Sequence, residues 1–324
     1  MPDIVTMGEL LVDFIPREKN CSLKKVENFT RAAGGAPANV AVGLSKVGVS
    51  AGFMGKIGED AFGDFLLETI SKYGVNTEHV IRTNKAMTTL AFVSLTDEGE
   101  RDFAFYRKPG ADMLFAKEEI DLAYLSRSKI FHCGSLSLTA ETSKETTYYL
   151  LGKCQDNNIL ISFDPNIRLP LWANDIARAR AEIRKVLPYV SLIKLSLTEL
   201  EQILDFNLTS LEDATIKNKA QELMKLGPDY IFLTGGETGV WFISESEYHF
   251  VPGKDISVKD TTGAGDAFMA GVLSYLIDFF PDFNPRSVDW LKALKRGNNF
   301  GALASSRYGA IPSLPAREEI GEVF

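Results

Sequence analysis

Short apolar runs alternate with amphipathic segments along the whole chain, at the spacings typical of strands and helices in turn. This alternation predicts an α/β fold with a mostly parallel sheet, because parallel strands need helical crossovers that cover both faces. The expected strands are 4–7, 51–56, 129–133, 160–164, 190–195 and 230–233. The expected helices are 38–46, 61–73, 141–156, 174–187, 197–205, 212–226, 264–280 and 286–306. No long linker or repeat interrupts them, so residues 1–324 are predicted to form one domain.

Two β-rich runs break this alternation. Residues 89–96 and 101–107 are separated by the turn-forming sequence Asp-Glu-Gly-Glu at 97–100, which is typical of a hairpin. A hairpin between helical units is expected to stand off the main sheet, together with strand-like residues near 11–17. An ordinary edge hairpin is the alternative. One apolar face of this hairpin is predicted to pair with a second subunit, and its members are Leu90, Phe92, Phe103 and Phe105.

Composition narrows the functional classes. The chain has 324 residues, 45% of them hydrophobic, so it can bury a large core. Its net charge of −8 argues against a nucleic-acid-binding or anionic-membrane surface. Cys21, Cys133 and Cys154 are odd in number and unrelated in spacing, so they indicate neither a disulfide framework nor a thiolate metal site. Without a basic and apolar leader or a membrane-spanning apolar run, we expect a cytoplasmic protein.

The most informative segment is D-T-T-G-A-G-D-A-F at 260–268, which opens directly into an apolar helical run. A helix start presents unpaired N–H groups and a positive dipole end, so it attracts phosphate, and Gly263 and Gly265 let the phosphate approach closely. Asp266 would repel that phosphate unless it had a task, such as accepting a proton from an attacking hydroxyl. The alternative is structural: Thr262 caps the helix and Asp266 complements its dipole.

A second glycine-rich segment, A-G-G-A-P-A-N-V-A at 33–41, favours the catalytic interpretation of the first segment over the structural one. The two segments together resemble the paired signatures of the PfkB (ribokinase-like) carbohydrate kinases, and the resemblance spans nearly the whole chain. It implies a three-layer α/β/α domain with a mostly parallel central sheet. It also implies a small β lid, formed from about 11–31 and 87–107, which covers a sugar site and often makes a dimer contact. ATP and Mg²⁺ are the implied co-substrate and cofactor.

The resemblance assigns roles at the phosphate end of the cleft. Asp266 matches the catalytic base, and the amides of Gly263, Ala264 and Gly265 match the anion hole for the transferring phosphoryl group. No P-loop and no protein-kinase motif set occurs that could do this instead. The segment T-G-G-E-T-G at 234–239 follows a strand and resembles the family's nucleotide-phosphate loop; a simple connecting turn is the alternative. The implied ATP-binding residues are Lys194, Thr234, Gly235, Gly236, Gly239, Gly263, Gly265 and Asn298.

Cation sites follow from the same resemblance. The segment K-L-S-L-T-E at 194–199 stands where the family usually has an Asn-x-x-Glu element that organises Mg²⁺ and its waters. Glu199 keeps the acid and is expected to act through water, whereas Ser196 replaces the asparagine. A first-turn helix carboxylate is the alternative for Glu199. Asp260 and Thr262 match positions that contribute to a K⁺ site in several members.

The sugar-binding part of the cleft is expected to use short polar side chains and the exposed backbone of glycine residues. The segment F-D-P-N-I-R-L-P-L-W at 163–172 leaves a strand through a proline, which favours an extended loop that projects Asp164, Asn166 and Arg168 over the cleft. Arg168 could hold a phosphate or substrate oxygen through its donor fork, or form a structural salt bridge. The resemblance implies these sugar-binding residues: Asp13, Gly34, Gly35, Asn39, Phe105, Arg107, Asn166 and Asp266. It also places Arg168 with the catalytic residues.

The residues of these motifs are most similar to those of the fructokinase branch of the family, which implies transfer of the ATP γ-phosphate to D-fructose. A 2-keto-3-deoxygluconate kinase is the alternative enzyme. A catalytically silent, kinase-like regulatory protein is the alternative of another class, and the intact Gly263, Gly265 and Asp266 disfavour it. A dinucleotide-binding dehydrogenase is excluded, since no Gly-x-Gly-x-x-Gly turn follows the first strand. The expected partners are a small sugar and a second copy of the chain.

Overall fold

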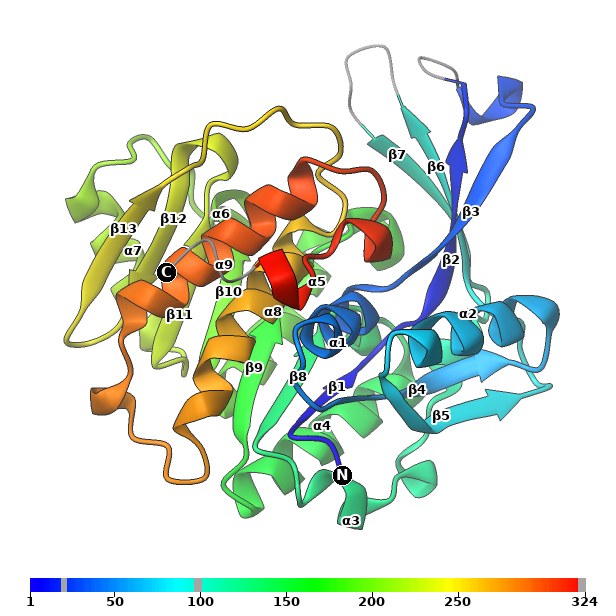
Figure 1. The fold of residues 1–324 in the computed structure, drawn as a ribbon, viewed down its shortest axis with the longest axis horizontal. Coiled ribbons are helices and arrows are strands. Elements are labelled where there is room, and N and C mark those ends of the chain that lie inside the picture. The colour runs from blue at the N-terminus through cyan, green and yellow to red at the C-terminus, as the bar shows by residue number, and fades with distance from the viewer. Residues whose placement is uncertain (19–21, 96–100, 320–324) are drawn as a thin grey trace.

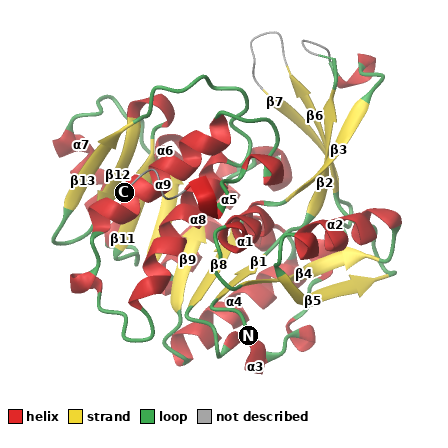
Figure 2. Cartoon of the chain, in the orientation of Figure 1, coloured by secondary structure: helices red, strands yellow, loops and turns green. Residues whose placement is uncertain are grey.

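The computed structural model describes residues 1–18, 22–95 and 101–319 (Figures 1 and 2). Nine strands of this part of the chain form one sheet in the order β13-β12-β11-β10-β9-β8-β1-β4-β5. All of its adjacent pairs are parallel except the two that β12 makes. Its strands are β1 (Ile4–Met7), β4 (Ala51–Gly58), β5 (Asn76–Thr83), β8 (Ile130–Gly134), β9 (Leu160–Asp164), β10 (Leu192–Ser196), β11 (Tyr230–Thr234), β12 (Gly239–Ile243) and β13 (Tyr248–Pro252).

Helices cover both faces of this sheet (Figure 1). One core cluster joins the sheet to α1 (Ala36–Lys46), α2 (Ala61–Lys72), α8 (Ala264–Leu276) and α9 (Trp290–Ser305). The other joins it to the remaining helices, which are α3 (Leu122–Leu125), α4 (Glu141–Asp156), α5 (Ile176–Val186), α6 (Leu197–Leu204) and α7 (Asp213–Met224). Adjacent residues of a strand point to opposite cores, as Ile4 and Val5 do. The predicted three-layer α/β/α architecture is therefore confirmed.

A separate four-stranded sheet projects from the main body beside α2, at the upper right of Figure 1. Its order is β3-β2-β6-β7, and β2 pairs with β6 in parallel while the other pairs are antiparallel. The predicted hairpin turn at 97–100 lies outside the described residues. The strands are β2 (Leu11–Pro16), β3 (Phe29–Gly34), β6 (Leu90–Leu95) and β7 (Arg101–Tyr106).

The register of this small sheet corrects one expectation. Leu90 pairs with Tyr106, so Phe105 pairs with Ala91 and lies on the face opposite to Leu90 and Phe92. The predicted single apolar face that includes both Phe92 and Phe105 is therefore wrong. An antiparallel register fixes which residues share a face, and the sequence does not give the register when the turn length is uncertain.

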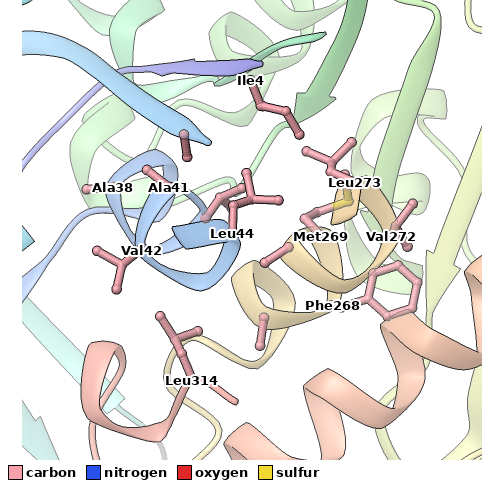
Figure 3. Packing of buried hydrophobic residues seen from close by; sticks show 14 of the residues in the cluster. Ile4, Ala38, Ala41, Val42, Leu44, Phe268, Met269, Val272, Leu273 and Leu314 are labelled. Atoms are coloured by element: carbon pink, nitrogen blue, oxygen red, sulfur yellow. The ribbon is translucent and has the colours of Figure 1, made fainter. Parts of the chain in front are cut away.

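Helices α1 and α8 pack closely in front of the sheet, and this contact brings the two glycine-rich segments together. Figure 3 shows Ala41 and Leu44 of α1 beside Met269 and Leu273 of α8. Gly43 permits the close approach, because a Cβ built there would lie 2.7 Å from Cβ of Ala270. The starts of the two helices are far apart in the sequence but adjacent in space, as the contact between Asn39 and Asp266, 227 positions apart, shows.

None of the helices in the described part of the chain has both the length and the hydropathy that a membrane-spanning segment needs.

Candidate active site

Two cavities flank the start of α8, at the end of the sheet where the parallel strands have their carboxyl termini. The first has a volume of about 460 Å³ and the second about 630 Å³. Thr261 and Gly265 line both cavities, so the glycine turn at the start of α8 forms a wall between them. Ligands of parallel α/β sheets bind at this end of the strands, which makes the pair of cavities the candidate active site.

Gly263 gives the wall its shape. Its φ of 77° is left-handed, and a Cβ there would lie 3.1 Å from Ala310, so only glycine is accommodated without strain. The preceding loop is held by Asp260, whose carboxylate accepts hydrogen bonds from the Thr262 amide at 2.8 Å and the Gly309 amide at 3.0 Å. The Thr262 hydroxyl also donates to it, at 2.7 Å. Asp260 therefore fixes the turn from which the first amides of α8 face the cavities.

Asp266 lies in the first turn of α8 and is only 9% exposed, yet it lines the first cavity. Burial raises its pKa to about 6, against the opposing effect of a hydrogen bond from Nδ2 of Asn39 to Oδ2 of Asp266 at 2.8 Å. Asn39 itself comes from the first turns of α1, 4% exposed. A carboxylate with this pKa is largely ionised at neutral pH and can accept a proton from a hydroxyl in the cavity.

A buried ion pair lies behind the glycine turn. Nζ of Lys194, in the middle of β10, is 3.0 Å from Oδ2 of Asp164, at the end of β9. Burial would lower the pKa of Lys194, but the Asp164, Glu199 and Asp266 carboxylates outweigh that effect and raise it. A Cβ on Gly265 would lie 2.7 Å from this ammonium group. The positive charge of Lys194 thus lies next to the start of α8, where the helix dipole is also positive.

The loop after β9 forms the floor of the first cavity. Asn166 adopts a left-handed φ of 43°, and its amide donates to Oδ1 of Asp164 at 3.2 Å. Asn166 and Arg168 both line the cavity, as predicted for this loop. Asp164, which was expected there too, is buried and does not line it, because it pairs with Lys194. Among the described residues, Arg168 forms no ion pair, so the salt-bridge alternative finds no support in this part of the chain. Its positive charge lowers the pKa of Asp266 after the larger effects of burial, Asn39, Asp164 and Lys194.

Glu199 has the helix-start position that the structural alternative predicted. Its carboxylate accepts from the Ser196 amide and hydroxyl and from the Ile167 amide at 2.8 Å, which makes a capping box at the start of α6. Glu199 also lines the first cavity. A carboxylate with both oxygens already hydrogen-bonded fits a hydrated Mg²⁺, contacted through water, better than direct coordination. The described residues contain no group of three acidic, histidine or cysteine side chains that could hold a metal ion directly.

The small sheet closes the far side of the first cavity. Asp13 of β2 and Phe105 of β7 line it from one face of that sheet, where both pair with Ala91. Gly34 leaves room for the carboxylate, because a Cβ there would lie 2.1 Å from Oδ2 of Asp13. Gly35 also lines the cavity.

Arg107, predicted to face the sugar, is placed differently. It is buried at the base of the small sheet and is not among the residues that line the cavity. Its Nε donates to Asp112 at 2.7 Å and its Nη1 to the Thr139 hydroxyl at 2.7 Å. These bonds join the small sheet to the loops of the main domain.

The second cavity is lined by four of the eight residues predicted to bind nucleotide, Gly265 among them. Thr234, Gly236 and Asn298 line it, and Nδ2 of Asn298 donates to the Pro252 carbonyl at 3.0 Å. Gly235 and Gly239 shape the loop instead: a Cβ on Gly239, where φ is 133°, would lie 2.4 Å from the Val251 carbonyl oxygen. Lys194 lines the first cavity rather than this one. Part of the lining comes from a connection that carries no recognisable motif, namely Gly253, Lys254, Asp255, Ile256 and Val258.

One carboxylate of the first cavity was missed by motif reasoning. Glu9 follows β1, lines the cavity and is only 4% exposed. Burial raises its pKa to about 7, although it accepts a hydrogen bond at 2.9 Å from the Ala36 amide. The signal available in the sequence was its position directly after the first strand, in G-E-L-L-V-D, where only Asp13 was chosen.

A model of the pfkB family of carbohydrate kinases matches residues 1–317. The chain belongs to that family. The resemblance drawn from the two glycine-rich segments is therefore confirmed, and so is the ribokinase-like fold, because the solved structures below superpose on the whole chain.

Several fructokinases are similar to this pfkB-family kinase over its whole length. A probable chloroplastic fructokinase-6 from Arabidopsis thaliana is 39% identical across 100% of this chain and 82% of its own. A fructokinase-2 from Oryza sativa is 39% identical across 96% of this chain and 90% of its own. The crystal structure of a fructokinase with bound ATP from Xylella fastidiosa is 33% identical and covers 100% of this chain and 98% of its own, with a TM-score of 0.87. A sugar kinase from Pyrococcus horikoshii in complex with ATP is 30% identical, with 99% and 100% covered and a TM-score of 0.84.

Proposed function

We propose that this pfkB-family kinase transfers the γ-phosphate of ATP to D-fructose, giving ADP and D-fructose 6-phosphate. The observation that carries the proposal is the position of Asp266, a buried carboxylate at the wall between two cavities, hydrogen-bonded to Asn39. The fructokinases from Arabidopsis thaliana and Oryza sativa, and the ATP-bound fructokinase from Xylella fastidiosa, support the choice of substrates.

In the proposed mechanism, fructose occupies the first cavity with its reacting hydroxyl beside Asp266. The carboxylate accepts the hydroxyl proton as the oxygen attacks the γ-phosphorus, and the bond to the bridging oxygen of ADP breaks. The amides of Gly263, Ala264 and Gly265 donate to the phosphoryl oxygens, on which negative charge accumulates. Lys194 and Arg168 add positive charge on the sugar side of the wall, where both line the cavity.

Sugar recognition is assigned to polar groups of opposite walls of the first cavity. Asp13 on the small sheet and Asn166 on the loop after β9 are suited to vicinal hydroxyls, because a carboxylate or carboxamide can engage two of them at once. Gly34 and Gly35 have no side chains, so their backbone can approach the sugar closely, and Phe105 offers an apolar surface to the sugar ring. Arg107 acts in this proposal through Asp112, by holding the base of the small sheet.

The nucleotide is assigned to the second cavity. Thr234 and Gly236 face the phosphates there, while Gly235 and Gly239 fix the shape of their loop. Asn298, on α9, lines the same cavity near the base or ribose. Mg²⁺, when bound beside Glu199 through its waters, would neutralise phosphate charge. For K⁺, the proposed ligands are in the loop of Asp260 and Thr262, which adjoins the anion hole.

A panel of sugars tests this function. Coupled ADP-release assays with D-fructose, 2-keto-3-deoxygluconate, ribose, tagatose and adenosine should give the highest kcat/KM for fructose, and NMR of the product should place the phosphate on O6. Faster turnover of 2-keto-3-deoxygluconate would identify the ketoacid kinase instead. Asp266→Asn is the matched control: an ADP signal that persists in it would come from a contaminating enzyme. No turnover of any sugar by wild-type protein, with ATP bound, would support a silent kinase-like protein.

We further propose that the small sheet is a lid and that its outer face pairs two copies of the chain. The outer face carries Phe14 and Phe92, stacked with ring centroids 4.7 Å apart, and Tyr106, which is 68% exposed. Phe14 and Phe92 are half-buried, so Tyr106 is the exposed part of this apolar face, and an exposed aromatic side chain there suits a contact surface. The proposed location is the cytoplasm, and the two described cysteines, Cys133 and Cys154, are buried free thiols that suit a reducing compartment. The Arabidopsis thaliana relative is named chloroplastic, so its own location differs.

A further inference from the structure

Among the described residues that line the first cavity, Glu9 is the one buried carboxylate to which the proposed mechanism gives no task. It stands at the bend between β1 and β2, and its Oε1 accepts from the amide of Ala36, the first residue of α1. That amide is one of the unpaired donors of a helix start. The helix has no side-chain cap of its own, because its N-cap residue is Gly35, and Pro37 has no N–H. Glu9 therefore caps α1 from a distant strand.

The contact is rigid on both sides. A Cβ on Gly35 would lie 2.2 Å from the backbone oxygen of Glu9, and a Cβ on Gly8 would lie 2.7 Å from Cγ of Pro37. The bend after β1 and the first turn of α1 are thus in van der Waals contact along their backbones. A shift of the Glu9 carboxylate would be transmitted to the helix start, since neither glycine leaves free space.

One turn further along, α1 presents Asn39 to the reacting group. The Asn39 amide donates to the Gly35 carbonyl at 2.9 Å, so the side chain is tied to the first turn. Its Nδ2 then donates to Oδ2 of Asp266 at 2.8 Å. Both residues are buried, and α1 is packed against α8, as Figure 3 shows. The position of this hydrogen bond therefore depends on the position of the first turn of α1.

We propose that Glu9 is a positioning residue for phosphoryl transfer: its carboxylate anchors the first turn of α1 and thereby sets the hydrogen bond between Asn39 and Asp266. The inference rests on the proposed function, in which Asp266 is the base. It adds a requirement to that function, because the anchor is strong only when Glu9 is ionised and the carboxylate faces the positive end of the helix.

The surroundings of Glu9 make this requirement pH-dependent near neutrality. Burial raises its pKa to about 7, and the amides of Glu9 and Ala36 oppose the rise. The charged groups that face it are at the base of the small sheet: Asp112 raises the pKa and Arg107 lowers it. The first turn of α1 contributes only backbone amides to this balance. Activity then needs two carboxylates ionised, Glu9 and Asp266.

The pH dependence of kcat/KM for fructose tests the inference. Wild type should approach a limiting slope of 2 in a plot of log(kcat/KM) against pH on the acid side, and Glu9→Gln a slope smaller by one. ATP ionises identically in both assays, so the difference between the slopes isolates Glu9. Equal slopes in the two enzymes would overturn the proposal while leaving the fructokinase function in place. A wild type inert toward every sugar would overturn the function instead.

A second variant keeps the proposal testable if Glu9→Gln fails to fold or if no sugar is turned over. Ala36→Pro removes the donated N–H and keeps Glu9, at the first helical position where proline is well accommodated. It should lower kcat/KM at pH 8 by about 10-fold, because the base is displaced from its partner. It should also raise the pKa of Asp266, read from the carboxyl carbon in NMR titrations of the ligand-free protein. An Asp266 that titrates as in wild type would contradict the anchor, with or without activity.

Discussion

Lys194 and Asp164 form a buried ion pair, 3.0 Å from Nζ to Oδ2, directly behind the glycine turn that begins α8. The two residues come from adjacent parallel strands, Lys194 from the middle of β10 and Asp164 from the end of β9, so the sheet itself sets the geometry of the pair. Lys194 lines the first cavity, on the sugar side of the wall between the cavities, and Asp164 lies next to it outside the cavity lining. The ammonium group is therefore placed to favour negative charge at the first amides of α8.

Removal of the cation tests this arrangement. Lys194→Met should lower the free energy of unfolding by roughly 3–5 kcal/mol, because it leaves the Asp164 carboxylate buried without its partner. Lys194→Met combined with Asp164→Leu should recover part of that stability but none of the lost kcat, since the positive charge is still absent. Urea unfolding and steady-state kinetics separate the two effects. A double variant with restored activity would show that Lys194 serves stability alone.

Gly265→Ala should be harmful although it sits in the first turn of a helix. Alanine in place of glycine normally stabilises a helix by about 1 kcal/mol, but here the added methyl group would lie 2.7 Å from the Lys194 ammonium. We expect kcat to fall by ~10²-fold, the scale for loss of an oxyanion-hole donor. Gly152→Ala in α4 is the matched control, because a Cβ there meets nothing within 4 Å. That variant should keep full activity and gain stability.

Asp266→Asn should lower kcat by at least ~10²-fold while the affinity for ATP stays within a few-fold, because proton acceptance is lost and the amides are spared. The same variant reports on pH. Burial raises the pKa of Asp266 to about 6 from an unfolded value of 3.8, so the stability that this group contributes below pH 3.8 is lost as pH rises through 6. Its melting temperature should therefore exceed that of wild type at pH 8 and approach it near pH 4. A constant difference across this range would contradict the raised pKa.

Arg168→Ala should reduce kcat/KM by an amount equivalent to ~2–4 kcal/mol with little change in melting temperature. The expectation follows from an exposed guanidinium that lines the cavity and lowers the pKa of Asp266 after stronger local effects. Arg82→Ala is a useful comparison, because Arg82 forms an ion pair with Asp64, neither residue lines a cavity of the site, and the change should affect activity little. If Arg168→Ala instead lost several degrees of stability, a structural role for the loop would be indicated.

Tyr106→Glu should shift the protein toward monomer if the outer face of the small sheet joins two copies, since a carboxylate would be buried in an aromatic contact. Leu211→Glu is the control, because Leu211 is also an exposed apolar residue but lies far along the chain from the small sheet. Sedimentation velocity at several concentrations measures the change. Identical sedimentation of wild type and Tyr106→Glu would remove the dimer contact from the proposal.

Sequence patterns predicted the parts of this molecule that local physics determines. The parallel inner strands and the helix at 141–156 were found because buried parallel strands and amphipathic helices have distinct apolar periods. The edge strands β5 and β13 were missed, since a half-exposed edge lacks a continuous apolar run. The inner strand β12 was missed as well, although its apolar residues are buried. Helix α9 begins at Trp290 rather than near 286, because Asp289 accepts from the Lys292 amide and sets the start there.

The site was predictable where glycine, proline or a motif marked it, and not where packing decides. Asp13, Asn39, Asn166 and Asp266 were named from motifs and meet in one cavity. Glu9 was overlooked, because nothing in a one-dimensional pattern says that its carboxylate reaches the start of a helix 27 residues later. Likewise, the position of Phe105 on the cavity face depended on the hairpin register.

The wall at the start of α8, lined on both sides by Thr261 and Gly265, has a kinetic meaning. Under the proposed function, each reactant occupies its own cavity on one side of this wall, and the phosphoryl group can cross only when both cavities are filled. The proposal therefore predicts a ternary complex and a single in-line displacement, with inversion of configuration at phosphorus. ADP can then depart while the phosphorylated sugar is still held on the opposite side.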